Sequence, residues 1–156
     1  MHPEILSIAL FWFVTAYTPG PNNIVASYSG FNFGITKTIP HIFGVTLGFT
    51  SLVFFLTIGL INVFKLFPII QIVMKYLGTL FLIYLAYKIS FSNISSKSDN
   101  INPVTFIDTF IFQFVNPKGV MAGITLVSKF VDNEKYLTSS LIVILVCSFT
   151  AFLSIS

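Results

Sequence analysis

Thr18-Pro19-Gly20-Pro21-Asn22-Asn23 interrupts the first long apolar segment of the chain. Proline has no N–H, so in a continuous helix the carbonyls of Thr15 and Tyr17, four residues before the two prolines, would lose their usual donors. Backbone polar groups that are freed inside a bilayer must be satisfied by other protein groups or by water in a cavity. The hexapeptide therefore predicts a broken membrane helix with a polar site beside it.

The composition is that of an integral membrane protein. Of the 156 residues, 55% are hydrophobic and only 8% are charged, whereas about a quarter of the residues in a soluble domain are charged. The net charge of +3 is spread along the sequence, so nucleic-acid binding is not expected. The single cysteine, Cys147, lies in an apolar run with no other metal ligand nearby, so neither a disulfide within the chain nor a metal site is expected.

Five apolar segments are long enough to cross a bilayer, because about 20 apolar residues span it as a helix. The segments cover residues 5–28, 39–64, 69–89, 106–127 and 137 to the last residues. The first is broken at the hexapeptide, and the fourth is broken at Asn116-Pro117-Lys118. The sequence therefore predicts an all-α fold, a polytopic transmembrane bundle of about five spans.

The two broken spans suggest an internal repeat. Each carries proline beside asparagine, and each is followed by another long apolar span. Three spans per repeat would invert the second copy relative to the first, as is common in secondary transporters. We therefore divide the single membrane domain, residues 1–156, into a first repeat at 1–90, a polar loop at 91–103 and an incomplete second repeat at 104–156.

Asn116-Pro117-Lys118 predicts the start of a half-helix inside the membrane. The residue before a proline avoids the helical conformation, so Asn116 suits an N-cap and Pro117 the first helical position. Free N–H groups and the positive end of the helix dipole would lie there. Lys118 adds a charge that would cost about 2.5–3.5 kcal/mol in lipid, so it should face a water-filled cavity or an anion such as a substrate carboxylate.

The hexapeptide can be interpreted in the same way, with Asn22 or Asn23 capping the half-helix that follows. The two breaks would then face each other near the membrane midplane and form a substrate-binding site. The alternative is a pair of simple kinks whose amides bond to neighbouring helices. The predicted site residues are Thr18, Pro19, Gly20, Pro21, Asn22, Asn23, Asn116, Pro117 and Lys118.

Two titratable residues are candidates for a proton relay. His41 lies at the start of the second span beside Pro40, where a hydrogen bond between helices is the simpler role. Asp108 lies about one turn inside the fourth span. It is either an acid near the membrane surface or the protonatable group of an antiporter.

Two glycine pairs, Gly44/Gly48 and Gly119/Gly123, have the spacing that lets membrane helices approach closely. We expect them to pack helices within the chain, with a homodimer contact as the alternative. Motifs of hydrolases, metalloproteases and nucleotide-binding proteins are absent from the sequence, and no acid–base pair lies inside the predicted spans. Neither an enzyme nor a protein with a bound cofactor is therefore expected.

Four stretches resemble the LysE/RhtB family of amino-acid exporters, in the order in which that family has them. They are the hexapeptide, residues 30–48, residues 74–88 and the run Gln113-Phe114-Val115-Asn116-Pro117-Lys118. The Pro-Asn-Asn ending and the Gln-Phe-Val-Asn run are most similar to the cysteine/O-acetylserine exporter branch. The resemblance implies a multi-pass protein of the bacterial cytoplasmic membrane that exports small amino acids through the lipid bilayer, driven by the proton gradient.

The family has about six helices, whereas this sequence ends within the fifth predicted span. We therefore expect an exporter that lacks its final helix. The substrate carboxylate would dock near Asn22, Asn23, Asn116 and Lys118, and one half of the bundle would rock against the other. The alternative is a truncated, non-transporting remnant or an accessory membrane subunit.

Overall fold

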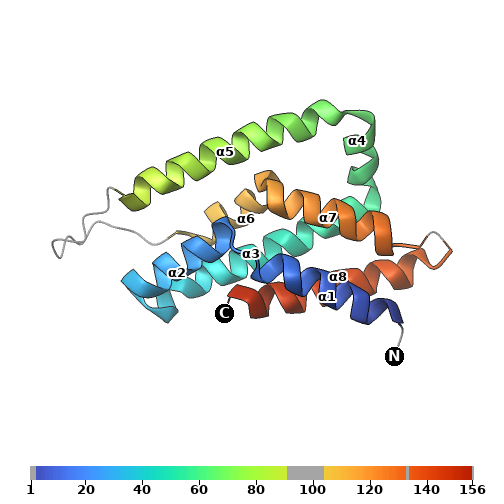
Figure 1. Ribbon diagram of the computed structural model, residues 1–156, viewed down its shortest axis with the longest axis horizontal. Coiled ribbons are helices and arrows are strands. Elements are labelled where there is room, and N and C mark those ends of the chain that lie inside the picture. The colour runs from blue at the N-terminus through green and yellow to red at the C-terminus, as the bar shows by residue number, and fades with distance from the viewer. Residues whose placement is uncertain (1–2, 91–103, 133, 156) are drawn as a thin grey trace.

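The chain folds into helices that run mostly along one direction, as Figure 1 shows. The computed structural model describes residues 3–90, 104–132 and 134–155, so the predicted loop at 91–103 lies outside the described residues. The elements are α1 (Pro3–Tyr17), α2 (Pro21–Phe33), α3 (Ile35–Phe55), the π-helical turn η1 (Leu56–Leu60), α4 (Ile61–Leu66), α5 (Pro68–Ser90), α6 (Phe106–Val115), α7 (Pro117–Phe130) and α8 (Tyr136–Ile155). The described part of the chain has no strand, so the all-α prediction is confirmed.

Two helical stretches have the length and hydropathy of a membrane span by themselves, Ile35–Phe64 and α8. A third is obtained if α6 and α7, which meet at an angle of 61°, form one broken span. Two further apolar stretches, Ile5–Tyr17 of α1 and Pro68–Phe81 within α5, are shorter than this length. The predicted helical membrane bundle is confirmed, and two or three of its five predicted spans meet this criterion.

The second predicted span starts earlier than expected and bends before its end. Helix α3 begins at Ile35 after Gly34, whose φ of 79° lies in the left-handed region that favours glycine. His41 therefore lies in the second turn of α3 and not at its start. Gly59 in η1 has a φ of 133°, and here the chain turns into α4, which leads to α5 along the top of Figure 1.

Helix α3 packs against α6 through the first glycine pair. A Cβ atom at Gly44 would lie 2.7 Å from the carbonyl oxygen of Phe106, and one at Gly48 would lie 2.8 Å from that of Phe110. Both carbonyls belong to α6, so only glycine lets the two backbones come this close. The prediction that this pair packs helices within the chain is confirmed.

Two further glycines mark close approaches. A Cβ atom at Gly123 of α7 would lie 2.7 Å from the side chain of Leu56, whereas one at Gly119 would meet no atom closer than 3.6 Å. Gly78 of α5 lies directly against the backbone at the α6–α7 break, where its Cβ would be 2.9 Å from Cδ of Pro117. Of the second glycine pair, only Gly123 thus packs closely against another helix. Helix α5 packs against the second break through Gly78.

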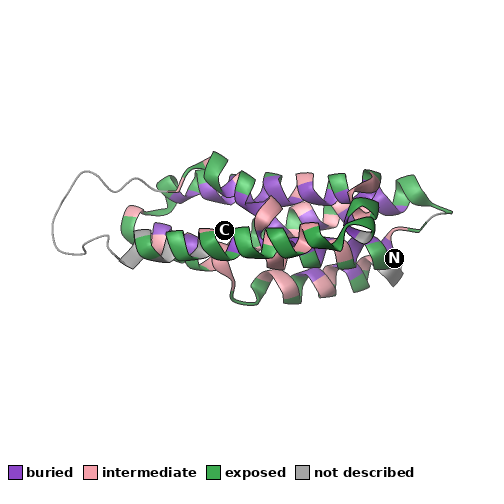
Figure 2. Ribbon diagram, turned by 90° about the horizontal axis from the view of Figure 1, so that it is seen from above, coloured by how far each residue is buried: buried purple, intermediate pink, exposed green. Residues whose placement is uncertain are grey.

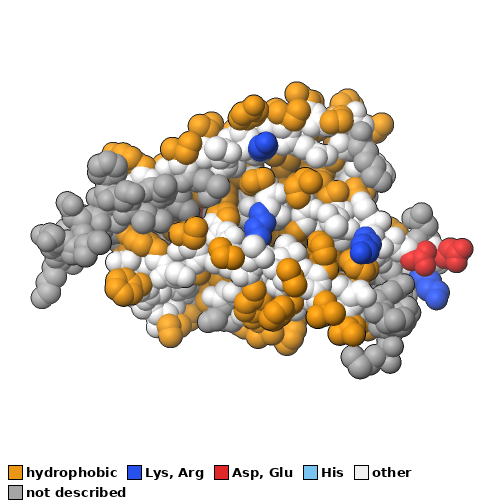
Figure 3. Space-filling view, in the orientation of Figure 1, with side chains coloured by type: hydrophobic (Ala, Val, Ile, Leu, Met, Phe, Trp, Pro, Cys, Tyr) orange, Lys and Arg blue, Asp and Glu red, His pale blue; other side chains and the backbone are white. Residues whose placement is uncertain are grey.

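Apolar side chains fill the bundle and also cover it. Buried residues gather on the sides of the helices that face one another, as Figure 2 shows. The space-filling view shows patches of hydrophobic side chains across the visible face, with acidic ones only near the turn between α7 and α8 (Figure 3). Asp132 and Glu134 of this turn are exposed. Such an apolar exterior is expected of helices that face lipid, whose chains are as apolar as leucine.

Candidate functional site

The second break forms as the sequence predicts. Asn116 is the N-cap of α7, with extended backbone angles (φ −70°, ψ 107°), and Pro117 follows as the first helical residue. The Oδ1 atom of Asn116 accepts a hydrogen bond from the backbone N–H of Lys118 at 3.2 Å. The prediction of a half-helix that starts here is confirmed.

The first break differs from the prediction in its cap. Gly20, with extended backbone angles (φ −162°, ψ 176°), is the N-cap of α2, and no side chain caps this helix. Pro21 takes the first helical position, so the cap falls one residue before it. Asn22 and Asn23 are the second and third residues of α2. The prediction that one of them is the N-cap is wrong, and their amides are free for other partners.

Asn22 joins α2 to α6 through a reciprocal amide pair with Gln113. The Nδ2 atom of Asn22 donates to Oε1 of Gln113 at 2.9 Å, and Nε2 of Gln113 donates to Oδ1 of Asn22 at 3.2 Å. Gln113 also donates to the carbonyl of Thr109 at 2.9 Å and is only 1% exposed. Gln113 is not among the site residues predicted from the sequence, although a lone amide in an apolar helix indicates a polar partner.

Side chains from both breaks donate hydrogen bonds to carbonyl oxygens at the end of α1. Asn23 donates from Nδ2 to the carbonyl oxygen of Ala16 at 3.2 Å, and the ammonium of Lys118 donates to the carbonyl oxygen of Thr18. The last carbonyls of a helix lack intrahelical partners and carry the negative end of its dipole. Lys118, although it belongs to the start of α7, is therefore stabilised by the end of α1.

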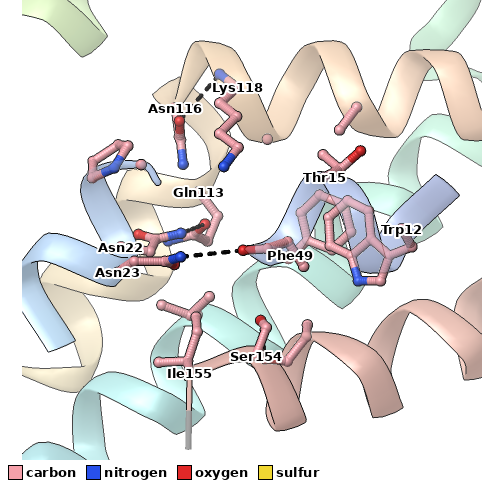
Figure 4. A pocket seen from close by; sticks show the side chains of 17 residues that line it. Trp12, Thr15, Asn22, Asn23, Phe49, Gln113, Asn116, Lys118, Ser154 and Ile155 are labelled. Carbon is pink, nitrogen blue, oxygen red and sulfur yellow. Dashed lines mark hydrogen bonds between the residues drawn. The ribbon is translucent and has the colours of Figure 1, made fainter. Parts of the chain in front are cut away.

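A cavity lies between the two breaks, as Figure 4 shows. Its empty volume, including the open mouth, is about 470 Å³. Its lining is divided by polarity. The polar side comprises Asn22, Asn23, Gln113, Asn116 and Lys118, and the apolar side comprises Trp12, Val45, Phe49, Ala122 and Ala151. Thr15 and Ser154 also line the cavity, and their hydroxyls donate to carbonyl oxygens of their own helices.

The cavity brings together most of the predicted site residues. Thr18 and Pro19 do not line it and are exposed between α1 and α2, and Pro117 packs against Gly78 of α5. The apolar side of the cavity could not be predicted, because an apolar residue in an apolar helix carries no signal of what it faces. The predicted residues that line the cavity are Gly20, Pro21, Asn22, Asn23, Asn116 and Lys118.

The two proton-relay candidates lie in different surroundings, and neither lines the cavity. His41 is 2% exposed, with Nε2 3.1 Å from the carbonyl oxygen of Asn22 and Nδ1 3.1 Å from the hydroxyl of Thr109. Asp108 is exposed in the first turn of α6, where its carboxylate accepts a hydrogen bond from the hydroxyl of Thr105 at 2.8 Å. His41 thus contacts a cavity residue, whereas Asp108 caps a helix.

Nearly the whole chain is similar to known membrane translocators. Residues 13–155 match the family described as LysE type translocator. The cysteine/O-acetylserine efflux protein of Salmonella typhimurium is 36% identical over 135 residues, which cover 84% of this chain and 68% of that protein. The protein of the same name from Escherichia coli K12 is 33% identical with the same coverage. No solved structure matches.

These relatives are named as efflux proteins and not as enzymes. The match includes both helix breaks and every residue that lines the cavity except Trp12. The chain therefore belongs to the LysE family of translocators.

Proposed function

We propose that this chain exports small amino acids or their derivatives across the bacterial cytoplasmic membrane, and that the substrate binds in the cavity between the two breaks. The observation that carries the proposal is the position of Lys118, a lone cation that lines this cavity at the start of α7. The similar proteins are named for cysteine and O-acetylserine, so these compounds are the first candidates.

The polar side of the cavity suits the two charged groups of an amino acid. Lys118 supplies a positive charge for the carboxylate. Gly119 adds backbone at the first turn of α7, where N–H groups lack intrahelical partners and favour anions. The amide oxygens of Asn22 and Asn23 are acceptors of the kind that an α-ammonium group needs.

Efflux from proteoliposomes tests this proposal. Vesicles that contain the purified chain would be loaded with labelled alanine, serine, cysteine or O-acetylserine, and with ethanolamine, which has no carboxylate. We expect saturable efflux of at least one of the amino acids and none of ethanolamine. Equal efflux of ethanolamine, or no efflux of any amino acid, would contradict the proposal.

Asn116→Asp should separate helix capping from substrate binding. Aspartate caps a helix as well as asparagine does, so thermal unfolding should be unchanged. Its negative charge beside Lys118 should repel the carboxylate and lower efflux at least tenfold, or about 1.4 kcal/mol. Asn116→Ala is the matched variant, because it removes the cap at a cost of about 1 kcal/mol without adding charge. Equal efflux by the two variants would exclude the charge effect.

We further propose that a proton gradient drives export and that His41 carries the proton. The hydroxyl of Thr109 lies 3.1 Å from Nδ1 of His41 and 2.9 Å from the carbonyl oxygen of Thr105. With neutral His41, the hydroxyl donates to Nδ1; with protonated His41, Nδ1 donates to the hydroxyl, which turns to Thr105. Rotation of one hydroxyl therefore lets His41 gain or lose a proton while the carbonyl of Asn22 keeps its donor.

His41→Gln should uncouple export from the gradient. Glutamine can donate to the carbonyl of Asn22 but cannot carry a proton at neutral pH. We therefore expect downhill efflux to persist at equal pH and its stimulation by a pH gradient to disappear. Asp108→Asn is the control and should keep the stimulation, because the carboxylate of Asp108 bonds to Thr105 at the start of α6. Stimulation that survives His41→Gln would exclude His41 as the proton carrier.

A further inference from the structure

We infer that substrates bind in one orientation, with the carboxylate at the first turn of α7 and the side chain against an apolar wall that limits its size. The apolar wall is defined as Trp12, Val45, Phe49, Ala122 and Ala151. This inference rests on the proposed function and names its substrate class. The substrates are α-amino acids with short, unbranched and uncharged side chains.

The helical register of α7 places the wall at the right distance from the cation. Lys118, Gly119 and Ala122 all line the cavity. Residues four apart lie on the same side of a helix, and Ala122 is about 6 Å further along the axis than Lys118. A substrate whose carboxylate lies at the start of α7 therefore meets Ala122 with its side chain. A short side chain of the substrate fills the space between the start of α7 and Ala122, whereas a branched or aromatic side chain collides with the wall.

The wall is fixed by the bundle core behind it. The rings of Trp12 and Phe49 stack with centroids 4.2 Å apart and planes inclined by 17°. The two side chains are 6% and 2% exposed, and Leu52 and Val53, the next buried residues of α3, are fully buried. A core packed in this way does not make room for extra methylene groups without strain. The wall therefore sets an upper limit on side-chain size.

The cavity also selects against charged side chains. Of the described residues that line it, only Lys118 is charged, and its ammonium group is already paired with the substrate carboxylate. A second charge on the substrate would lie against Val45, Phe49 and Ala122 without a partner. Burial of an unpaired charge is strongly unfavourable, so basic and acidic amino acids should be excluded.

Trp12 gives a direct signal from the wall, because it is the single tryptophan of the chain. The purified chain in detergent would be titrated with alanine, cysteine, methionine, phenylalanine and lysine while the tryptophan fluorescence is recorded. We expect saturable changes with the first three and none with phenylalanine or lysine. The inference is overturned if a transported amino acid leaves the fluorescence unchanged, or if phenylalanine binds as well as alanine.

Two substitutions in the wall should shift the size limit in opposite directions. Ala122→Val adds two methyl groups, so the affinity for methionine should fall at least tenfold relative to that for alanine, since one methylene is worth about 10- to 200-fold in a tight pocket. Val45→Ala, which removes two methyl groups on the facing helix, should raise the same ratio. Ser128→Val adds bulk at an exposed position of α7 and should change neither affinity.

The outcomes separate this inference from the proposed function. Size-independent weakening by Ala122→Val, or unchanged ratios in both wall variants, would overturn the orientation while leaving amino-acid export intact. If the unsubstituted chain binds and exports none of the amino acids, both proposals fail.

Discussion

Lys118→Ala is expected to lower amino-acid efflux at least 100-fold. The side chain lies in the cavity at the start of α7, and its ammonium donates a hydrogen bond to the carbonyl of Thr18 at the end of α1. The substitution removes the charge that pairs with the substrate carboxylate and leaves the end of α1 without this donor. Truncation of one partner of a desolvated charge pair costs about 2–5 kcal/mol, which corresponds to a loss of this size. Efflux from proteoliposomes would measure it.

Two variants separate charge from packing in this experiment. Lys118→Met keeps an unbranched stem beside Gly20, where a Cβ atom would lie 3.1 Å from Cδ of Lys118, and removes the charge together with its hydrogen bond to Thr18. It should be as inactive as Lys118→Ala. Lys129→Ala, in the last turn of the same helix, removes an exposed cation that lies 5.5 Å from the ring of Phe130 and should leave efflux unchanged. Efflux by Lys118→Met within about threefold of the unsubstituted chain, well under 1 kcal/mol, would show that the charge does not bind substrate.

The helix breaks could be predicted from the sequence because proline and asparagine act on the backbone next to them. Pro117 fixes the start of α7, and Asn116 caps it with its own side chain. The same local rule failed at the first break, where Pro21 moves the cap to Gly20. Asn22 instead forms hydrogen bonds with Gln113, which lies 91 residues away in the sequence, and no local pattern predicts this pair.

The apolar wall could not be predicted, because its residues are defined by contacts between helices. Trp12 and Phe49 are two apolar residues among many in α1 and α3, and only the packing of these helices brings their rings together. Lys118 shows the opposite case. A cation in an apolar segment must have a compensating partner, so a cavity or an anion could be expected, although its bond to the end of α1 could not. The division into two inverted repeats stays a prediction.

Gly48→Ala should lower the stability of the fold, because α3 and α6 touch at this position. The new Cβ atom would lie 2.8 Å from both Cγ of Gln113 and the carbonyl oxygen of Phe110. A backbone carbonyl cannot move aside as a flexible side chain can, so α6 must shift away from α3. Overpacking of this kind costs about 1–3 kcal/mol. The shift would also strain the amide pair between Gln113 and Asn22, so the folded fraction and the efflux of that fraction should fall together.

Gly30→Ala is the matched control for this prediction. A Cβ atom at Gly30 would meet nothing within 4 Å, and the residue lies within α2. Alanine is favoured over glycine in a helix by about 0.5–1 kcal/mol, so this variant should be at least as stable as the unsubstituted chain. Thermal unfolding of the purified variants would compare them. If Gly48→Ala were as stable as Gly30→Ala, α3 and α6 would not touch at Gly48. In that case this contact would not be what positions Gln113 at the cavity between the breaks.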